Sequence, residues 1–380
     1  MRRALTLALA LAWPGLASAI EIKPRRDKDL ANPEVLVIDI GGFVQPRLVW
    51  VPEDERADTP GELGFAVRRA RFEFSSRLAP QATSDWQFRH KLGFELMPEA
   101  RLQDAYLDAA WRQTVGLRAG QFKAPTTRSL LTSDRNTLFP ERGELVTLAP
   151  EREMGAMLYS TLLGERLDLY AGVFNGEGTN RLSNVNRKLL YVGRVELSPW
   201  GRERTKNELL KPGDRPWASV GYSFHYNVDG PPGQEHATVA HTADVYAYLS
   251  YVTVQAEFLY GISDWEDVNI ADSTSYGFYG QAGLFIFGVP WVQDHIAALA
   301  RYEQIDRFVP DERFDTALNG PTDPNQARRS VAFGLGYYVG PPRFERAQDM
   351  RVTVTYELKQ ELEGLEYDNN ELLVAAHMSF

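Results

Sequence analysis

The sequence predicts an all-β fold, a transmembrane antiparallel β-barrel of about 16 strands with an inward-folded third loop. Three observations lead to this prediction. Apolar and polar residues alternate with a period of two in many windows, so successive side chains would lie on opposite faces of a strand. Long polar connections tend to alternate with short turns, as they do in membrane barrels. Aromatic residues lie near the ends of the expected strands, where a barrel meets the membrane surface.

The first nineteen residues have the order of a secretory signal peptide. Arg2 and Arg3 form a short basic segment, an apolar run covers 4–13, and small residues follow up to Ala19. The apolar run is too short to span roughly 30 Å of hydrocarbon. We therefore expect a signal peptide at 1–19, a short polar lead-in at 20–34 and the barrel at 35–380.

Composition excludes several classes of partner. The formal net charge is −10, and it becomes −12 once Arg2 and Arg3 are removed with the signal peptide. Nucleic acid is therefore not an expected partner, because phosphate binding requires a basic face. The chain has no cysteine, so neither disulfides nor thiolate metal sites are expected. No cofactor and no metal are expected either.

The strands are expected wherever the two-residue alternation is clear. In "RARFEFSSRL", Phe72 and Phe74 alternate with Arg71, and in "DWQFRHKLGFEL", Phe88 alternates with Arg89. We expect the phenylalanines, Phe94 included, to face lipid and the charged residues to face water. A secreted β-sandwich or solenoid also alternates, but its dry core rarely accepts arginine or lysine at every second position. The expected strands cover 37–50, 63–78, 85–97, 102–112, 114–123, 152–161, 166–174, 189–199, 216–226, 240–249, 252–260, 274–287, 292–303, 329–338, 349–358 and 371–380.

The connections follow the membrane pattern with two exceptions. The connection near 98–101 is short where a long loop is expected, and the turn near 200–215 is long where a short one is expected. The last strand, "ELLVAAHMSF", is expected to pair with the first and to close the barrel. Aromatic residues expected in the membrane-surface girdles are Trp50, Trp86, Trp111, Tyr159, Tyr191, Trp217, Tyr260, Trp291 and Tyr337.

The expected lumen carries a set of basic side chains on its second to fifth strands. Fixed positive charge in a pore raises the local anion concentration, and guanidinium groups pair well with carboxylate and phosphate oxygens. An alternative is that these cations only balance Glu73, Asp85, Glu95, Asp104 and Asp108 on neighbouring strands. The candidate pore-lining residues are Arg69, Arg71, Arg77, Arg89, Lys91, Arg112 and Arg118.

The connection 124–151 is the longest in the amino-terminal half. A barrel of about 16 strands encloses a wide channel, so an inward-folded loop is the expected constriction. An external loop that only caps the rim is the alternative. The charged residues expected at this constriction are Arg128, Asp134, Arg135, Glu141, Arg142 and Glu144.

Four segments resemble the phosphate-selective porin O and P family. They are a strand "GLRAGQFKAP" at 116–125, a loop "SDR…FPER" at 133–142, a strand "APEREMGAML" at 149–158 and a turn "GVFNGEG" at 172–178. The resemblance implies a sixteen-stranded outer-membrane barrel, usually a homotrimer, with an arginine-lined path and a third loop that narrows the pore. It also implies that Arg118, Lys123, Arg135 and Arg142 occupy recurring basic positions, which adds Lys123 to the pore-lining candidates.

The expected function is therefore passive diffusion of small hydrophilic solutes through a Gram-negative outer membrane, with a preference for anions such as phosphate. The acidic net charge and the equal numbers of acids and bases at the constriction leave a general, weakly selective porin as the alternative. A barrel enzyme or a structural barrel is a further alternative. The chain has six histidines but neither a GxSxG nor an HExxH motif, so an enzyme is not expected. The expected partners are outer-membrane lipid and the solute.

Overall fold

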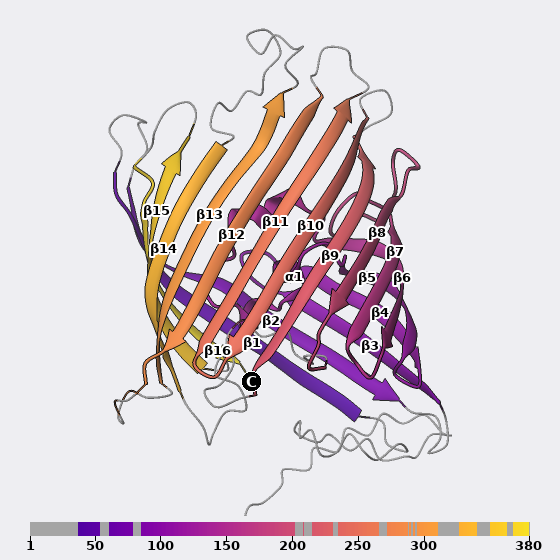
Figure 1. Ribbon diagram of the computed structural model, residues 1–380, viewed down its shortest axis with the longest axis horizontal. Helices are drawn as coiled ribbons and strands as arrows, with labels where there is room; N and C mark the ends of the chain where they lie inside the picture. Colours follow the sequence, from indigo (N-terminus) through magenta and orange to yellow (C-terminus); the bar gives the residue numbers. More distant parts are fainter. Residues whose placement is uncertain are drawn as a thin grey trace, which may run out of the picture.

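The computed structural model shows one closed sheet in which each strand pairs antiparallel with its sequence neighbours (Figure 1). The first strand, β1 (Val37–Val51), pairs with the last, β16 (Glu371–Ser379), so the sheet has no free edge. Closure satisfies the backbone hydrogen-bonding groups that lipid cannot satisfy. The structure describes residues 37–53, 61–78, 85–201, 208, 215–230, 235–265, 272–287, 289, 292, 295–310, 327–339, 350–362 and 368–379.

The sixteen strands confirm the predicted fold, and most of their bounds lie within a few residues of those expected. The expected signal peptide and lead-in, 1–34, lie outside the described residues. Between β1 and β16 the strands are β2 (Glu62–Leu78), β3 (Trp86–Glu95), β4 (Arg101–Trp111), β5 (Val115–Lys123), β6 (Arg152–Leu162), β7 (Leu167–Phe174), β8 (Leu190–Leu197), β9 (Trp217–Asp229), β10 (His236–Leu249), β11 (Val252–Trp265), β12 (Ser273–Phe285), β13 (Ile296–Pro310), β14 (Ala327–Tyr338) and β15 (Met350–Glu361).

Closure by the carboxy-terminal strand is confirmed in detail. Trp50 of β1 lies opposite Leu372 of β16, and Phe43 lies opposite Ser379. On the inner face Val49 packs with the buried side chains of Leu373 and Ala375. The described part of the alternating "ELLVAAHMSF" sequence thus has one face toward the barrel interior and the other toward the outside.

The inward and outward faces follow the predicted alternation. Phe72, Phe88 and Phe94 are exposed on the outer face, and Arg71 pairs with Glu95 on the inner face at 2.8 Å. The β2–β3 register places Arg71 opposite Glu95 and Arg77 opposite Arg89. Because side chains alternate along paired strands except at bulges, this register determines which of these residues reach the lumen.

Of the nine aromatic residues predicted for the girdle, six are exposed on the outer face, Tyr159 and Trp217 are not, and Trp291 lies outside the described residues. Tyr159 points into the lumen, where its hydroxyl donates to Asp108 Oδ1 at 2.7 Å. The Trp217 indole N–H donates to the Gly201 carbonyl at 2.5 Å, and its ring lies 5.4 Å from that of Tyr246. Both predictions rested on a place near a strand end, which does not determine the face. Those exposed on the outer face as predicted are Trp50, Trp86, Trp111, Tyr191, Tyr260 and Tyr337.

Among the described connections, tight turns join β4 to β5, β6 to β7 and β10 to β11 at one end of the barrel. Between β4 and β5, Arg112 and Gln113 have φ angles of 48° and 56°, and the Thr114 N–H donates to the Trp111 carbonyl at 2.9 Å. Two consecutive positive φ angles give a turn whose twist matches that of the strands it joins. In the described part of the chain, no helix is long and apolar enough to cross a bilayer.

The facing of β3 can be tested by single cysteines, since the chain has none of its own. Cysteine at position 89 or 91 should react with a water-soluble thiol reagent in the folded barrel, whereas cysteine at 88 or 94 should not. The reason is that the first pair faces the lumen and the second faces lipid. Reversed labelling would mean that the register is shifted by one residue.

Candidate functional site

The connection between β5 and β6 folds into the barrel and crosses its lumen (Figure 1). We call residues 124–151 the constriction loop. It contains the helix α1 (Arg128–Leu131) and the 3₁₀ helices η2 (Asp134–Asn136) and η3 (Glu144–Leu148). The Thr127 side chain caps α1 by accepting the Leu130 N–H at 3.0 Å. The inward-folded third loop is thus confirmed.

Apolar residues of the loop are buried against the part of the barrel wall formed by β11–β13. Leu138 and Phe139 pack with Phe285 of β12 and Leu299 of β13. Leu145 packs with a second group that includes Leu259 of β11. Burial of each such side chain contributes about 1.5–3 kcal/mol. The sequence "NTLFPERGEL" therefore anchors the loop to the wall with its apolar residues, while its Glu141 faces β1 and β2 and its Glu144 faces β13 and β14.

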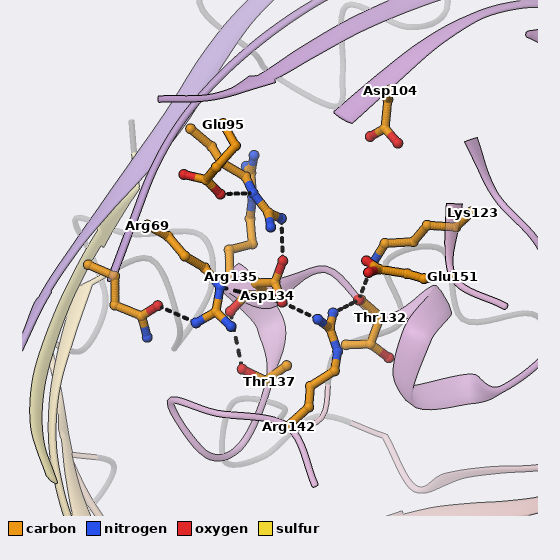
Figure 2. Close-up of polar contacts among 12 residues, drawn as sticks. Arg69, Glu95, Asp104, Lys123, Thr132, Asp134, Arg135, Thr137, Arg142 and Glu151 are labelled. Atoms are coloured by element: carbon orange, nitrogen blue, oxygen red, sulfur yellow. Dashed lines mark hydrogen bonds and ion pairs between the residues drawn. The ribbon is translucent and has the colours of Figure 1, made fainter. Parts of the chain in front are cut away.

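Asp134 is the centre of the loop's attachment to β2. Its side chain is 2% exposed and forms ion pairs with Arg71 and Arg142, and the Arg69 Nε lies 3.8 Å from Oδ1. Figure 2 shows the carboxylate between Arg69 and Arg142. Burial alone would raise the pKa of Asp134, but Arg142, Arg71 and Arg69 hold it well below its usual range. Asp134 is therefore a buried carboxylate that remains charged.

Glu141 attaches the loop a second time, to β1 and β2. Its carboxylate accepts from Arg47 at 3.0 Å, from Arg68 at 2.7 Å and from Arg69 at 2.9 Å. Burial favours the neutral acid, but Arg69 and Arg68 prevail and lower the pKa of Glu141. Sequence alternation places Arg68 on the outer face. Arg68 is the extra residue of a bulge, because Gln45 pairs with Arg69 and Pro46 pairs with Val67, and its guanidinium reaches Glu141 inside the barrel.

The remaining cations of the loop also have partners. Arg135 forms an ion pair with Glu73 of β2. Arg142 additionally donates to the Ser129 carbonyl at 3.0 Å, which braces the loop internally. Arg128 is fully buried at the opposite wall, with Nη1 3.6 Å from Glu196 of β8. These predicted constriction residues therefore hold the loop in place.

Lys123 and Glu144 lie at the two borders of the loop. The Lys123 ammonium donates to the Thr132 carbonyl at 2.8 Å, which ties the end of β5 to the loop. Glu144 pairs with Arg307 of β13 at 2.7 Å and lies 3.9 Å from Arg328 of β14. Beside Glu144 the loop borders a cavity of about 150 Å³ between 139–144 and β13–β16.

The predicted basic residues of β3 and β5 line a more open part of the wall. Arg89 is 41% exposed, and its Nε lies 3.9 Å from Asp108. Arg118 donates twice to Asp108 at 3.0 Å and lies over the Tyr106 ring at 4.3 Å. Lys91 is partly exposed and pairs with Glu73 at 3.0 Å and Asp104 at 3.1 Å.

Arg112 is misplaced among the pore-lining candidates. It lies in the β4–β5 turn with a positive φ, exposed, paired with Asp85 at 3.0 Å and stacked on Trp111. The strand ends one residue earlier than expected, so the alternation stops before Arg112 reaches the lumen. The five carboxylates proposed as charge-balancing partners do pair with basic residues: Glu73, Asp85, Glu95, Asp104 and Asp108.

The "GVFNGEG" segment has a structural role beside the loop. Gly176 and Gly178 have φ angles of 81° and 88°, which favour glycine. Their N–H groups donate to the two carboxylate oxygens of Glu153 at 3.1 and 2.9 Å. Glu153 is the second residue of β6, directly after the constriction loop. The glycines therefore secure the strand on which the loop ends.

Several residues of the site were not predicted. Arg47 carries a signal, because it alternates with Phe43 and Gln45 on the inner face. Glu303 and Glu257 accept loop N–H groups from more than a hundred residues away in sequence, and nothing local in the sequence indicates this. The long turn near 200–215 is an exception to the expected pattern of connections, and its Glu208 is buried against the loop.

Replacing Asp134 should strongly destabilise the barrel. In Asp134→Asn three buried or nearly buried guanidiniums lose their shared carboxylate. We expect the free energy of unfolding to fall by about 3–5 kcal/mol. Urea unfolding in detergent micelles measures this free energy. The matched control is Glu144→Gln, a partly exposed pair expected to cost at most about 1 kcal/mol.

The pKa of Asp134 also predicts how this difference depends on pH. Because the folded value lies below the unfolded value of about 3.9, the stabilisation is complete above about pH 4 and declines as the pH falls toward the folded pKa. The stability difference between the wild type and Asp134→Asn should be constant from about pH 7 to pH 5 and shrink below about pH 4. If this stability difference already declined between pH 7 and pH 5, the result would contradict the lowered pKa of Asp134.

The similarities to known proteins agree with this geometry. Residues 52–205 match the family model of phosphate-selective porin O and P, and no curated protein matches the chain. Among solved structures, the outer-membrane channel DcaP of Acinetobacter baumannii has 13% identity and a TM-score of 0.63, covering 91% of this chain and 97% of that one.

Two further structures are similar in fold. OmpT of Vibrio cholerae in a trimer form has 12% identity and a TM-score of 0.59, with coverage of 91% of this chain and 99% of that one. OmpF of Salmonella typhi, in complex with daunomycin, has 10% identity and a TM-score of 0.59, with coverage of 90% and 97%. The chain therefore has the fold of outer-membrane porin barrels, and its residues 52–205, which include the constriction loop, match the phosphate-selective porin O and P family.

Proposed function

We propose that this porin is a water-filled channel for passive diffusion of small hydrophilic solutes with a modest preference for anions. The preference is carried by Arg77, Arg89, Lys91 and Arg118 on β2, β3 and β5, which we call the cation face. The phosphate of the family's name is one candidate solute. In this proposal the anion preference does not come from the arginines that surround Asp134.

The single observation that carries the proposal is the layering of charge on this wall. Arg89 is 41% exposed, whereas the side chain of its neighbour Asp108 is 1% exposed. Asp108 lies behind the cations and accepts from Arg118 and Tyr159. A solute in the lumen therefore meets guanidinium groups first, and the negative charge acts from behind them. Such a surface favours anions.

The register of β2 and β3 adds a second observation. Arg77 and Arg89 lie directly opposite each other on the inner face. Like charges at opposed positions destabilise a sheet, and among the described residues Arg77 forms no ion pair. An anion from the lumen can bridge two such guanidiniums, each of which offers several donors. The pair is therefore well suited to a passing anion.

The preference should be modest because the other basic residues are neutralised. Arg69 and Arg71 are nearly buried in their pairs with Asp134, Glu141 and Glu95. Near the cavity beside β13–β16, acids and bases are mixed, with Glu357 and Glu371 beside Lys359. A general, weakly selective porin is the second candidate, and these neutralised charges are the observation that favours it.

Two finer features belong to the same proposal. We propose that a signal peptide at 1–19 is cleaved on export to the outer membrane, on the evidence of its basic, apolar and small-residue order. We also propose a homotrimer, supported by the trimer form of the similar OmpT barrel. The family match and the fold support a channel function rather than an enzymatic one.

The proposal is tested by the reversal potential of planar bilayers in a potassium chloride gradient. Arg77→Gln combined with Arg89→Gln should lower the chloride-to-potassium permeability ratio, because the exposed positive charge is removed. The matched control is Arg112→Gln, an exposed arginine outside the lumen, which should leave the ratio unchanged.

Adding inorganic phosphate to the same bilayers tests the solute. Phosphate should reduce the chloride current of the wild type more than that of the double variant. An unchanged ratio in the double variant, or a cation preference in the wild type, would rule out the anion preference and leave the general porin.

A further inference from the structure

We propose that three glutamates, Glu208, Glu257 and Glu303, are positioning residues that set the aperture of the pore. Each accepts backbone N–H groups of the constriction loop and so acts on the solute path through the position of that loop. The inference rests on the proposed function only in that it treats the barrel as a conducting channel. It is independent of the preference for anions.

Glu303 of β13 makes the tightest of these contacts. Its Oε2 accepts the Glu144 N–H at 2.8 Å and its Oε1 accepts the Leu145 N–H at 2.7 Å. These are the first two N–H groups of η3, which have no acceptor within the helix. A Cβ added to Gly143 would lie 2.5 Å from Glu303 Oε1, so only glycine permits this approach.

Glu257 of β11 holds the start of α1 in the same way. Its Oε1 accepts the Ser129 N–H at 2.6 Å. The same oxygen accepts from Gln255 Nε2 at 3.0 Å and from the Tyr279 hydroxyl at 2.9 Å. Gln255 is fully buried and Tyr279 nearly so, and both lie on the wall beneath the loop. The wall therefore presents a prearranged acceptor to the loop backbone.

Glu208 reaches the loop from the opposite end of the barrel. It lies between β8 and β9, and the antiparallel order places that connection at the other end from the β5–β6 connection. Its N–H donates to the Asn136 carbonyl at 2.9 Å, and its Oε2 accepts the Leu138 N–H at 2.6 Å. Gln281 of β12 donates to the same Oε2 at 2.9 Å. One residue thus holds the loop backbone at two points.

The two sides of the loop are consequently held by different chemistry. Toward β1 and β2, wall arginines bind the loop carboxylates of Asp134 and Glu141. Toward β11–β13, the loop has an ion pair, Glu144 with Arg307, and its N–H groups are bound by Glu257 and Glu303 of the wall and by Glu208 of the β8–β9 connection. In the described part of the chain these three glutamates form no ion pair. For a buried carboxyl group that forms no ion pair, such donors offset part of the cost of burial. The position of the loop therefore determines whether these carboxyl groups have hydrogen-bond donors, and their hydrogen bonds in turn hold the loop.

Glu303 is the member of the group that bears most directly on aperture. The cavity of about 150 Å³ beside β13–β16 is bordered by Glu144 of the loop and by Arg301 of β13. The Glu303 bonds fix Glu144 and Leu145, so they fix one border of this cavity. Releasing them leaves Glu144 with its partly exposed ion pair to Arg307, which permits that border to move, whereas the ion pairs on β1 and β2 keep the rest of the loop inside.

The test is single-channel recording of Glu303→Ala in planar bilayers. Loss of a hydrogen bond to a charged acceptor shifts the population of the released segment by about tenfold or more. We therefore expect open-channel current noise to rise about twofold or more, with a changed mean conductance. Glu303→Gln retains a carbonyl acceptor and should restore part of the wild-type behaviour. The control is Glu165→Gln, an exposed acid in the β6–β7 turn, which should change neither quantity.

Gly143→Ala perturbs the same contact from the loop side. It should reproduce the rise in noise in the wild-type background, because the new methyl group displaces the Glu303 carboxylate. In the Glu303→Ala background it should add little, since the clash is gone. Because Glu303→Ala and Gly143→Ala perturb the same contact, the test remains valid if one of them inserts poorly into the bilayer.

Wild-type noise and conductance in both Glu303→Ala and Gly143→Ala would overturn the inference, as would fully additive effects in the double variant. A wild-type protein that does not conduct at all would instead contradict the proposed channel function. The two failures are therefore distinguishable.

Discussion

The burial of a charged Asp134 is the interaction on which the rest of this pore depends. A barrel of sixteen strands encloses a lumen wide enough for a channel, so the contents of the lumen decide what passes. Asp134 binds Arg71 of β2 and Arg142 of its own loop, and lies near Arg69. It thereby ties the loop to the wall and removes basic charge from the constriction at the same time. The cluster thus fixes the position of the loop and neutralises the arginines around it.

The attachment of the loop explains the roles of the segments that resemble the porin O and P family. In "GLRAGQFKAP", Lys123 binds the loop carbonyl of Thr132 and Phe122 packs with Phe174. In "APEREMGAML", a Cβ on Gly155 would lie 2.6 Å from Phe174 Cα, so glycine permits that packing. The "GVFNGEG" glycines secure Glu153 at the start of β6. The segments therefore contribute mainly to how the loop is held, and Arg118 is the one residue of the proposed cation face that lies within them.

Sequence alone predicted the barrel well because its signal is local. Two-residue alternation assigned Phe88 outward and Arg89 inward, and the pairing of neighbouring strands then carries the assignment along the sheet. It failed where the alternation is interrupted, as at the bulge that turns Arg68 inward and at the turn that removes Arg112 from the wall.

The candidate site was predicted less completely than the fold. The loop and its charged residues were identified by length and composition, and the possible ion pairs of Glu73, Asp104 and Asp108 by proximity of strands. Which arginines are buried and which are exposed depends on contacts such as Arg69 with Glu141, 72 residues apart. No local pattern indicates such contacts, so choosing Arg77 and Arg89 rather than Arg71 for the proposed anion preference required the structure.

The most direct test of this account is the reversal potential of Glu141→Gln in a potassium chloride gradient. Glu141 neutralises Arg47, Arg68 and Arg69 within a partly exposed cluster. If loop carboxylates suppress the positive charge of the constriction, removing this one should raise the chloride-to-potassium permeability ratio above that of the wild type. An unchanged or lower ratio would show that these arginines do not face the permeating ions, and would contradict the account.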